Sequence, residues 1–477
     1  EHAVERIKEN PECLNDVAKM TLRKKEAVLE GLKDEMDEAE QQLRYFTANG
    51  LNLRQAMKVQ AVYGTELMEK LKENPYRLVE EVDGIGFVTA DKLAKKMGYE
   101  DDDPLRISAA CISFVMEECM RTGNSYVPMD EFQQILERKL AGIPYDFDSI
   151  LDTLRRNRKI VIEEDRVYHV SQYDAEVSIS RFFSLYLNNP MEPIDGETIR
   201  DNIDVIEQEL GITYQFHQRM AMEMFFEKPV MILTGGPGTG KTTIVRAMVN
   251  LCRRMYPTAS VSLCAPTGRA AKRLSTLTNH PATTIHSLLK WDLETNTFGK
   301  NQDDPLLLDV LIVDEFSMVD AYLFYHLLLA GTKVRKLVLI GDEDQLPSVS
   351  PGCVLTDMLK SELFPTVRLT EIFRQKQGSD IITLAHEIRN DRVTEVPQGN
   401  NVRFFPCNKF EVRHYVMELV RQALERGYQL EDVQVLAPKY VGVAGIDTLN
   451  SMLQSELNPP EFSKREWKVG YRTFREG

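Results

Sequence analysis

The feature that most constrains the fold is a glycine-rich segment at residues 235–242, which reads Gly-Gly-Pro-Gly-Thr-Gly-Lys-Thr. It follows an apolar run at residues 230–233, typical of a buried strand, and precedes a segment with helical periodicity. Glycines at this spacing let backbone N–H groups wrap around phosphates, and the N-terminus of the following helix adds a favourable dipole. The sequence therefore predicts a phosphate-binding P-loop in an α/β fold.

The polar residues of this loop are the types that phosphate chemistry requires. The Lys241 ammonium can neutralise charge on the β- and γ-phosphates, and the Thr242 hydroxyl is a suitable Mg²⁺ ligand. We therefore expect a nucleoside triphosphate and Mg²⁺. The residues predicted to bind the nucleotide are Gly235, Gly236, Pro237, Gly238, Thr239, Gly240, Lys241, Thr242 and Thr243.

An acidic pair follows another apolar run, Val-Leu-Ile-Val at residues 310–313. Asp314 is predicted to hold Mg²⁺ and Glu315 to polarise the attacking water. Acidic pairs are common on protein surfaces, but the position of this one after a buried strand and downstream of the P-loop favours catalysis.

Two polar residues further along the chain are weaker candidates. Gln345 follows the apolar run at residues 337–340 and could sense the γ-phosphate by hydrogen bonding; alternatively, it is a solvated loop residue. Arg374 could act as an arginine finger on transition-state charge, although in isolation an Arg near a helix start is usually a surface residue.

The remaining chain has regions of different character. Its 477 residues correspond to about three domains of ~150 residues. The first of these regions is helical and charged, and a hairpin at residues 160–170 after several helices resembles a winged helix. From residue 197, apolar runs alternate with helical segments, which predicts a parallel sheet covered on both faces. The run at residues 433–436 is expected to begin a second α/β domain.

Composition excludes several classes of protein. With 43% hydrophobic and 27% charged residues, the chain is expected to be globular, with neither a membrane span nor a signal peptide. Seven scattered cysteines without a Cys-x-x-Cys pair favour a reducing cytoplasm over a disulfide framework or zinc site. Because 73 acidic residues exceed 58 basic ones, the net charge of −15 by itself argues against a nucleic-acid partner.

A tight turn in the N-terminal region points the other way. Gly84-Ile85-Gly86 joins two short helical segments and could expose backbone N–H groups to a DNA phosphate. A turn with only packing value is the alternative, and these residues alone do not decide between the two.

The order of the motifs resembles that of superfamily 1 helicases, specifically the RecD-like 5′–3′ DNA helicases with an extended N-terminal region. The resemblance is most specific between residues 218 and 375. It implies RecA-like motor domains, ATP as the nucleotide, and an adenine contact by Gln218. The DNA-contacting residues that it implies in the motor are Pro266, Thr267, Gly268, Arg269 and His286.

The resemblance also implies a domain organisation. Residues 1–103 would form a helical region with a helix-hairpin-helix. This favours DNA contact or a DNA-facing structural role for Gly84 and Gly86 over a turn with only packing value. A winged-helix-like region at 104–190 would precede the first RecA-like domain, 1A, at 197–375; within it, residues 291–304 would form the small hairpin insertion 1B, either a strand-separating pin or an ordinary surface hairpin. Residues 376–477 would form part of the second RecA-like domain, 2A.

The chain departs from the family pattern at two positions. Phe316 stands where the family often has Ala, and Ser350 stands where it often has Gly. Both differences are expected to alter packing more than chemistry.

The implied function is an ATP-dependent motor that moves along single-stranded DNA and unwinds 5′-tailed duplex DNA in repair or recombination. A net acidic chain is compatible with this function because a local basic channel suffices, with Arg269, Lys272 and Arg273 as candidates. Two alternatives stay open: an NTP-dependent DNA-binding switch or clamp without unwinding, and a non-enzymatic DNA-binding scaffold. Neither the residues nor the resemblance indicates an oligomeric state.

The late helicase motifs, one of which supplies a further arginine, have no match here, so we expect the rest of the second motor domain to be missing from this chain. Residues 1–477 should therefore bind nucleotide but hydrolyse it poorly unless a separate C-terminal segment completes the cleft. Steady-state ATPase assays with and without single-stranded DNA test this prediction. Brisk DNA-stimulated hydrolysis by this chain alone would contradict it.

Overall fold

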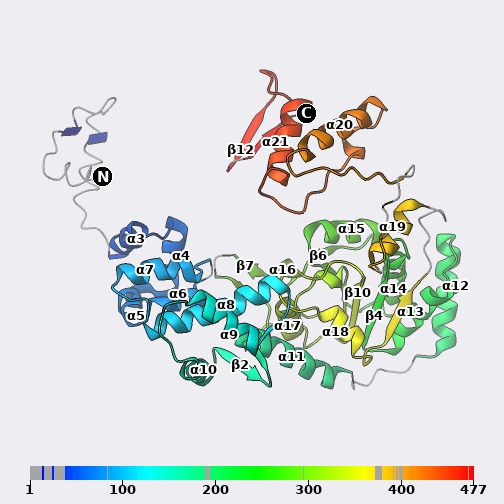
Figure 1. The fold of residues 1–477 in the computed structure, drawn as a ribbon. Coiled ribbons are helices and arrows are strands. Elements are labelled where there is room, and N and C mark those ends of the chain that lie inside the picture. Colours follow the sequence, from blue (N-terminus) through cyan, green and yellow to red (C-terminus); the bar gives the residue numbers. More distant parts are fainter. Residues whose placement is uncertain are drawn as a thin grey trace. The chain divides into compact units, whose positions relative to one another are not determined.

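The computed structural model describes residues 13–14, 24–25, 38–82, 84–187, 194–293, 295–370, 379–389, 391–393, 396, 401–470 and 472–476. The chain separates into two compact units, Glu1–Arg374 and Gln375–Gly477, and each is considered by itself (Figure 1). Among the described residues, no helix is both long enough and apolar enough to cross a membrane.

The N-terminal region is a bundle of short helices around its own apolar core. A hydrogen bond from Gln55 Nε2 to the Gly84 carbonyl (2.8 Å) joins the N-terminus of one helix to the turn before another. Gly84 has φ +84°, the left-handed conformation that favours glycine. The helices are α3 (Glu38–Ala48), α4 (Leu53–Tyr63), α5 (Leu67–Glu73), α6 (Leu78–Glu81) and α7 (Phe87–Lys96), with short 3₁₀ turns at Gly64–Glu66 and Pro75–Arg77.

A buried carboxylate ties this bundle to the next region. Asp91 on α7 accepts hydrogen bonds from Arg106 Nε (2.7 Å) and from the Tyr76 hydroxyl (2.9 Å). The Arg106 guanidinium also lies over the Phe87 ring, 5.8 Å from its centroid. These contacts give part of the Gly84–Lys92 segment a structural role.

The following region has the element order of a winged helix. Its three strands form an antiparallel sheet in the order β1-β3-β2, in which Ile160 pairs with His169 and Tyr126 with Tyr168. The hairpin predicted at residues 160–170 is present. The elements are α8 (Pro104–Thr122), β1 (Tyr126–Pro128), α9 (Met129–Lys139), α10 (Phe147–Arg156), β2 (Ile160–Glu163), β3 (Arg166–His169) and α11 (Val170–Tyr186).

The centre of the first unit is a six-stranded sheet in the order β11-β4-β10-β9-β5-β6, with every neighbouring pair parallel. The strands that contain the four predicted apolar runs, β4, β5, β9 and β10, are largely apolar and buried, whereas the edge strands β6 and β11 were not predicted and are more exposed. The strands are β4 (Val230–Gly235), β5 (Val261–Ala265), β6 (Ala282–Thr284), β9 (Val310–Val313), β10 (Lys336–Gly341) and β11 (Thr366–Leu369).

Helices cover both faces of this sheet. Successive side chains of β4 alternate between the two cores: Val230 and Ile232 pack with α17, whereas Met231 and Leu233 pack with α14. The remaining elements of this part are α12 (Gly196–Leu210), α13 (Phe216–Glu227), α14 (Lys241–Met255), α15 (Gly268–Thr278), α16 (Ile285–Leu288), α17 (Ala321–Ala330), α18 (Val354–Lys360), the 3₁₀ turn η4 (Phe316–Met318) and the hairpin strands β7 (Trp291–Asp292) and β8 (Thr297–Phe298).

The winged-helix-like region packs directly on the sheet domain through α11, which lies beside α17 (Figure 1). The Phe183 and Phe324 rings stack with centroids 6.0 Å apart, and the Tyr186 hydroxyl donates to the Val334 carbonyl (3.1 Å). The Gly352 N–H also donates to the Gly123 carbonyl (2.9 Å). Through α11, the winged-helix-like region therefore joins the apolar core on one face of the sheet, while its other elements form a core of their own.

The second unit contains α19 (Asp380–Arg389), α20 (Val412–Glu425), the 3₁₀ turn Leu430–Asp432, α21 (Ile446–Leu457) and the paired strands β12 (Glu466–Val469) and β13 (Arg472–Arg475). The prediction of a strand at residues 433–436 is wrong: the segment has no strand partner among the described residues, and Leu436 is 83% exposed. An apolar run becomes a strand only where a neighbouring strand satisfies its backbone hydrogen bonds.

Replacing Gly352 with Ala should destabilise the first unit. Gly352 has φ +103°, and an added Cβ would lie 2.6 Å from the Ala321 Cβ. A variant that combines backbone strain with overpacking should lose roughly 1–3 kcal/mol more of its free energy of unfolding than a variant with backbone strain alone. Gly211→Ala is the matched control, since Gly211 has φ +63° and open space around it. Equal losses of thermal stability in the two variants would contradict this account.

Candidate nucleotide-binding site

The predicted site residues meet because parallel strands present their carboxyl ends at one edge of a sheet. The loops after β4, β9 and β10 border a cavity of about 370 Å³. Its lining residues are Ile212, Thr213, Tyr214, Gln218, Pro237, Gly238, Thr239, Gly240, Lys241, Thr242, Thr243, Ala270, Arg273, Leu274, Asp314, Glu315 and Gln345. Most of the residues predicted for nucleotide and metal thus border one cavity, while Gly235 and Gly236 belong to the same loop without lining it.

The conformation of the loop explains its glycines. Gly238 and Gly240 have φ +81° and φ +87°, and Gly240 is the N-cap of α14. A Cβ on Gly235 would lie 2.7 Å from the carbonyl oxygen of Leu369 on the neighbouring strand. Side chains at these positions would strain the backbone or collide with β11.

Lys241 points back across the loop toward main-chain carbonyl groups. Its Nζ donates to the carbonyl oxygens of Gly235 and Gly236, the latter at 3.0 Å. Burial lowers the pKa of Lys241, and the charges of Asp342 and Asp314 oppose that shift. The ammonium therefore lies in a place where an anionic ligand would stabilise its charge.

The acidic pair is held under electrostatic and conformational strain. Burial raises the pKa of Asp314 to about 6, although the Glu315 N–H donates to its Oδ1 (2.9 Å) and so favours the charged form. Glu315 itself has φ +52°, a left-handed conformation uncommon outside glycine. A metal ion would relieve the cost of charging Asp314, and strained backbone of this kind concentrates at functional sites.

Both predicted glutamines line the cavity. Gln218 is buried, and its Oε1 accepts from the Gln215 N–H (3.0 Å), which fixes the amide at the start of α13. Gln345 follows β10, and its Nε2 donates to Asp342 Oδ2 (3.4 Å). Both side chains can offer hydrogen bonds to a ligand in the cavity.

Several residues that line the cavity were not predicted from the sequence. Residues 212–214 precede α13 and form a wall beside Gln218. Ala270, Arg273 and Leu274 come from α15, and sequence reasoning assigned Arg273 to a DNA channel. The i, i+3, i+4 spacing on α15 was a signal, but only the packing of α15 against α14 shows which helix face turns to the cavity.

The residues predicted to touch DNA in the motor lie after two adjacent strands of the same edge. Pro266–Arg269 follow β5 and His286 follows β6, the partner of β5. The Thr267 hydroxyl caps α15 by accepting from the Ala270 N–H (3.2 Å). The exposed His286 ring lies 5.8 Å from the Trp291 ring, at the base of the β7–β8 hairpin.

The remaining predicted site residues are Gly84, Gly86 and Arg374. Gly84 and Gly86 are in the N-terminal bundle, in the turn before α7. Arg374 lies outside the described residues, so its position relative to the nucleotide cavity stays a prediction.

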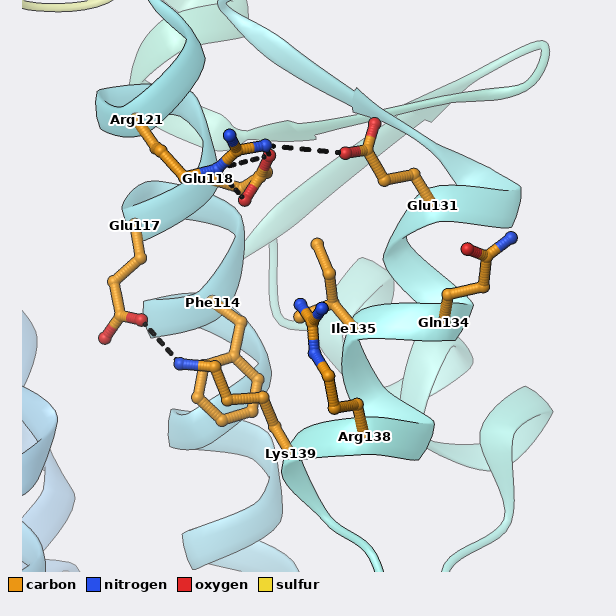
Figure 2. A pocket seen from close by; sticks show the side chains of 9 residues that line it. All are labelled: Phe114, Glu117, Glu118, Arg121, Glu131, Gln134, Ile135, Arg138 and Lys139. Carbon is orange, nitrogen blue, oxygen red and sulfur yellow. Dashed lines mark hydrogen bonds and ion pairs between the residues drawn. The ribbon is translucent and has the colours of Figure 1, made fainter.

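A larger cavity of about 480 Å³ between α8 and α9 is a poor site for an anion (Figure 2). Three acidic and three basic side chains line it, so their charges cancel. Glu117 pairs with Lys139 at 3.1 Å, and Arg121 bonds to Glu118 and lies 3.8 Å from Glu131. Most of the charged side chains that line this cavity are therefore paired with one another.

The raised pKa of Asp314 predicts a pH-dependent cost in stability. The folded state keeps the Asp314 proton up to about pH 6, whereas an unfolded aspartate releases it near about pH 4, so stability falls as pH rises between these values. Relative to the parent chain, the free energy of unfolding of Asp314→Asn should therefore rise by as much as about 3 kcal/mol as the pH increases across this window. Urea unfolding at several pH values measures the difference.

Asp309→Asn is the control for that experiment. Hydrogen bonds from the Ser260 N–H and hydroxyl lower the pKa of Asp309, so its contribution to stability is lost as pH falls, the opposite trend. Parallel pH profiles for Asp314→Asn and the parent chain would show that Asp314 carries no such cost.

Comparison with known proteins agrees with this geometry. Residues 218–351 match the family model described as "AAA domain", and residues 35–126 match the model described as "ATP-dependent RecD2 DNA helicase HHH domain". The crystal structure of the Pif1 helicase from Candida albicans is 23% identical, with a TM-score of 0.32 over 46% of this chain and 56% of that one, a likeness too weak to carry an argument.

Two curated relatives are similar to the chain in sequence. The chain is 31% identical over 430 residues to the ATP-dependent RecD2 DNA helicase of Deinococcus radiodurans, covering 86% of this chain and 57% of that protein. It is 38% identical over 165 residues to the RecBCD enzyme subunit RecD of Mycolicibacterium smegmatis, covering 30% of each. The chain is thus similar to RecD-like helicases, and it spans somewhat more than half of the length of the Deinococcus radiodurans relative.

Proposed function

We propose that the protein is an ATP-dependent 5′–3′ DNA helicase that couples hydrolysis to movement along single-stranded DNA and to unwinding of 5′-tailed duplexes, in DNA repair or recombination. The observation that carries the proposal is the cavity at the carboxyl edge of the sheet, where Lys241, Asp314, Glu315 and Gln345 come together.

The chemistry divides among these side chains. Lys241 neutralises charge on the β- and γ-phosphates, Glu315 orients and polarises the attacking water, and Gln345 senses the γ-phosphate. Arg374 is proposed to stabilise charge that develops in the transition state. Gln218 contacts the adenine from the start of α13.

Magnesium fits the oxygen donors of the cavity. Thr242 offers a hydroxyl and Asp314 a carboxylate, both ligand types that Mg²⁺ prefers. The ion, when bound with ATP, neutralises phosphate charge. Holding it also favours the charged form of Asp314, whose pKa burial raises.

DNA is proposed to cross the edge formed by the ends of β5 and β6. Pro266, Thr267, Gly268 and Arg269 would contact the backbone there together with His286. The adjacent β7–β8 hairpin would separate the strands as a pin. Gly84 and Gly86 would bind duplex phosphate from the N-terminal bundle.

Unwinding of matched 5′-tailed and 3′-tailed duplexes by the full-length protein tests the proposal, together with ATPase assays. We expect DNA-stimulated hydrolysis and unwinding of the 5′-tailed substrate only. Lys241→Ala should abolish both, and Glu315→Gln should retain nucleotide binding while hydrolysis falls by roughly 10²-fold or more. Lys333→Ala, at an exposed position in the turn before β10, is the charge-matched control and should be unaffected.

Three results would count against the proposal in different ways. Hydrolysis without any DNA stimulation would favour a nucleotide-dependent switch or clamp. Activity only on the 3′-tailed duplex would refute the polarity. Unwinding that survives Lys241→Ala would overturn the site assignment.

A further inference from the structure

Arg273 lies on the one face of α15 that borders the nucleotide cavity. Ala270, Arg273 and Leu274 all line that cavity, and their spacing of three and four residues places them on one side of the helix. Arg269 and Lys272, the neighbouring basic residues, do not line it. The three basic side chains of this segment therefore have different surroundings.

Arg273 shares its cavity with the groups proposed to carry out catalysis. Lys241, Asp314 and Glu315 line the same space of about 370 Å³. The Arg273 guanidinium therefore borders the volume that a bound polyphosphate would occupy.

Within the described part of the chain, the Arg273 guanidinium makes no hydrogen bond or ion pair. By contrast, Arg219 bonds to Glu207 at 2.9 Å, and Arg254 bonds to Glu209 at the same distance. A guanidinium that lines a cavity and keeps its planar set of donors is suited to a phosphate group.

Arg273 also contributes to the charge balance of the cavity. Lys241 and Arg273 are the basic residues that line it, and Asp314 and Glu315 are the acidic ones, so the protein lining is neutral with Arg273 and negative without it. A negative lining would oppose the approach of a polyphosphate. Lys241 lies at the start of α14, whereas Arg273 comes from α15.

We propose that Arg273 contacts the terminal phosphate of bound ATP. The inference rests on the proposed nucleotide function of this cavity and replaces the expectation that Arg273 belongs to the DNA channel. The contact has a mechanical consequence, because α15 begins at Gly268, within the segment Pro266–Arg269 that is proposed to hold DNA. Loss of the γ-phosphate would release one side of α15 while its N-terminus stays on the DNA.

Equilibrium binding of two fluorescent nucleotides to residues 1–477 with Mg²⁺ tests the proposal, using a non-hydrolysable ATP analogue and ADP. Arg273→Ala should weaken binding of the ATP analogue by about tenfold or more, as expected for a lost charge-assisted contact, and leave ADP binding nearly unchanged. Arg273→Lys, which keeps the charge but loses the planar fork, should fall between. Lys272→Ala removes the same charge one residue away and should behave like the parent chain.

The controls separate failure of this inference from failure of the proposed function. If Lys241→Ala leaves binding of both nucleotides intact, the cavity is not the nucleotide site, and both proposals fall. If Lys241→Ala abolishes binding while Arg273→Ala leaves it unchanged, or weakens ATP and ADP equally, only the Arg273 proposal falls. Equal losses in Lys272→Ala and Arg273→Ala would likewise reduce the effect to general electrostatics.

Discussion

The structure of the first unit depends on the parallel pairing of six strands, of which the central ones are buried. Parallel neighbours cannot be joined by tight hairpins, so each connection must cross a face of the sheet, and here α14, α15 and α17 make such crossings. The result is a sheet buried on both faces. Because every strand runs the same way, the loops that carry polar residues collect at one edge, and residues far apart in the chain line one cavity.

That edge concentrates features that do not favour stability. Asp314 is buried with a raised pKa, Glu315 has a left-handed backbone, and Gly235 has no room for a side chain. The hydroxyl groups of Thr234 and Ser317 have no hydrogen-bond partner among the described residues. The apolar interior of the sheet stabilises this arrangement, and function is the reason to retain it.

The loop after β10 connects the cavity with the N-terminal region. Gln345 lines the nucleotide cavity and also a second cavity of about 530 Å³, whose other wall includes Tyr126 and Glu176 of the winged-helix-like region. The bond between Gly352 and Gly123 lies beside it. The loop that carries Gln345 is therefore packed between the candidate nucleotide-binding cavity and the winged-helix-like region.

Local patterns in the sequence determined the P-loop, the Asp314–Glu315 pair and the alternation of strands and helices, because each signal is contiguous and depends on neighbouring residues. The net charge averages over the whole surface, so it does not test for a local basic channel. The predicted strand at residues 433–436 was wrong because a strand requires a partner. Only the tertiary structure placed Arg273 and Tyr214 in the nucleotide cavity. Helix packing decides which face of α15 turns inward, and that orientation is set by contacts between residues distant in the chain.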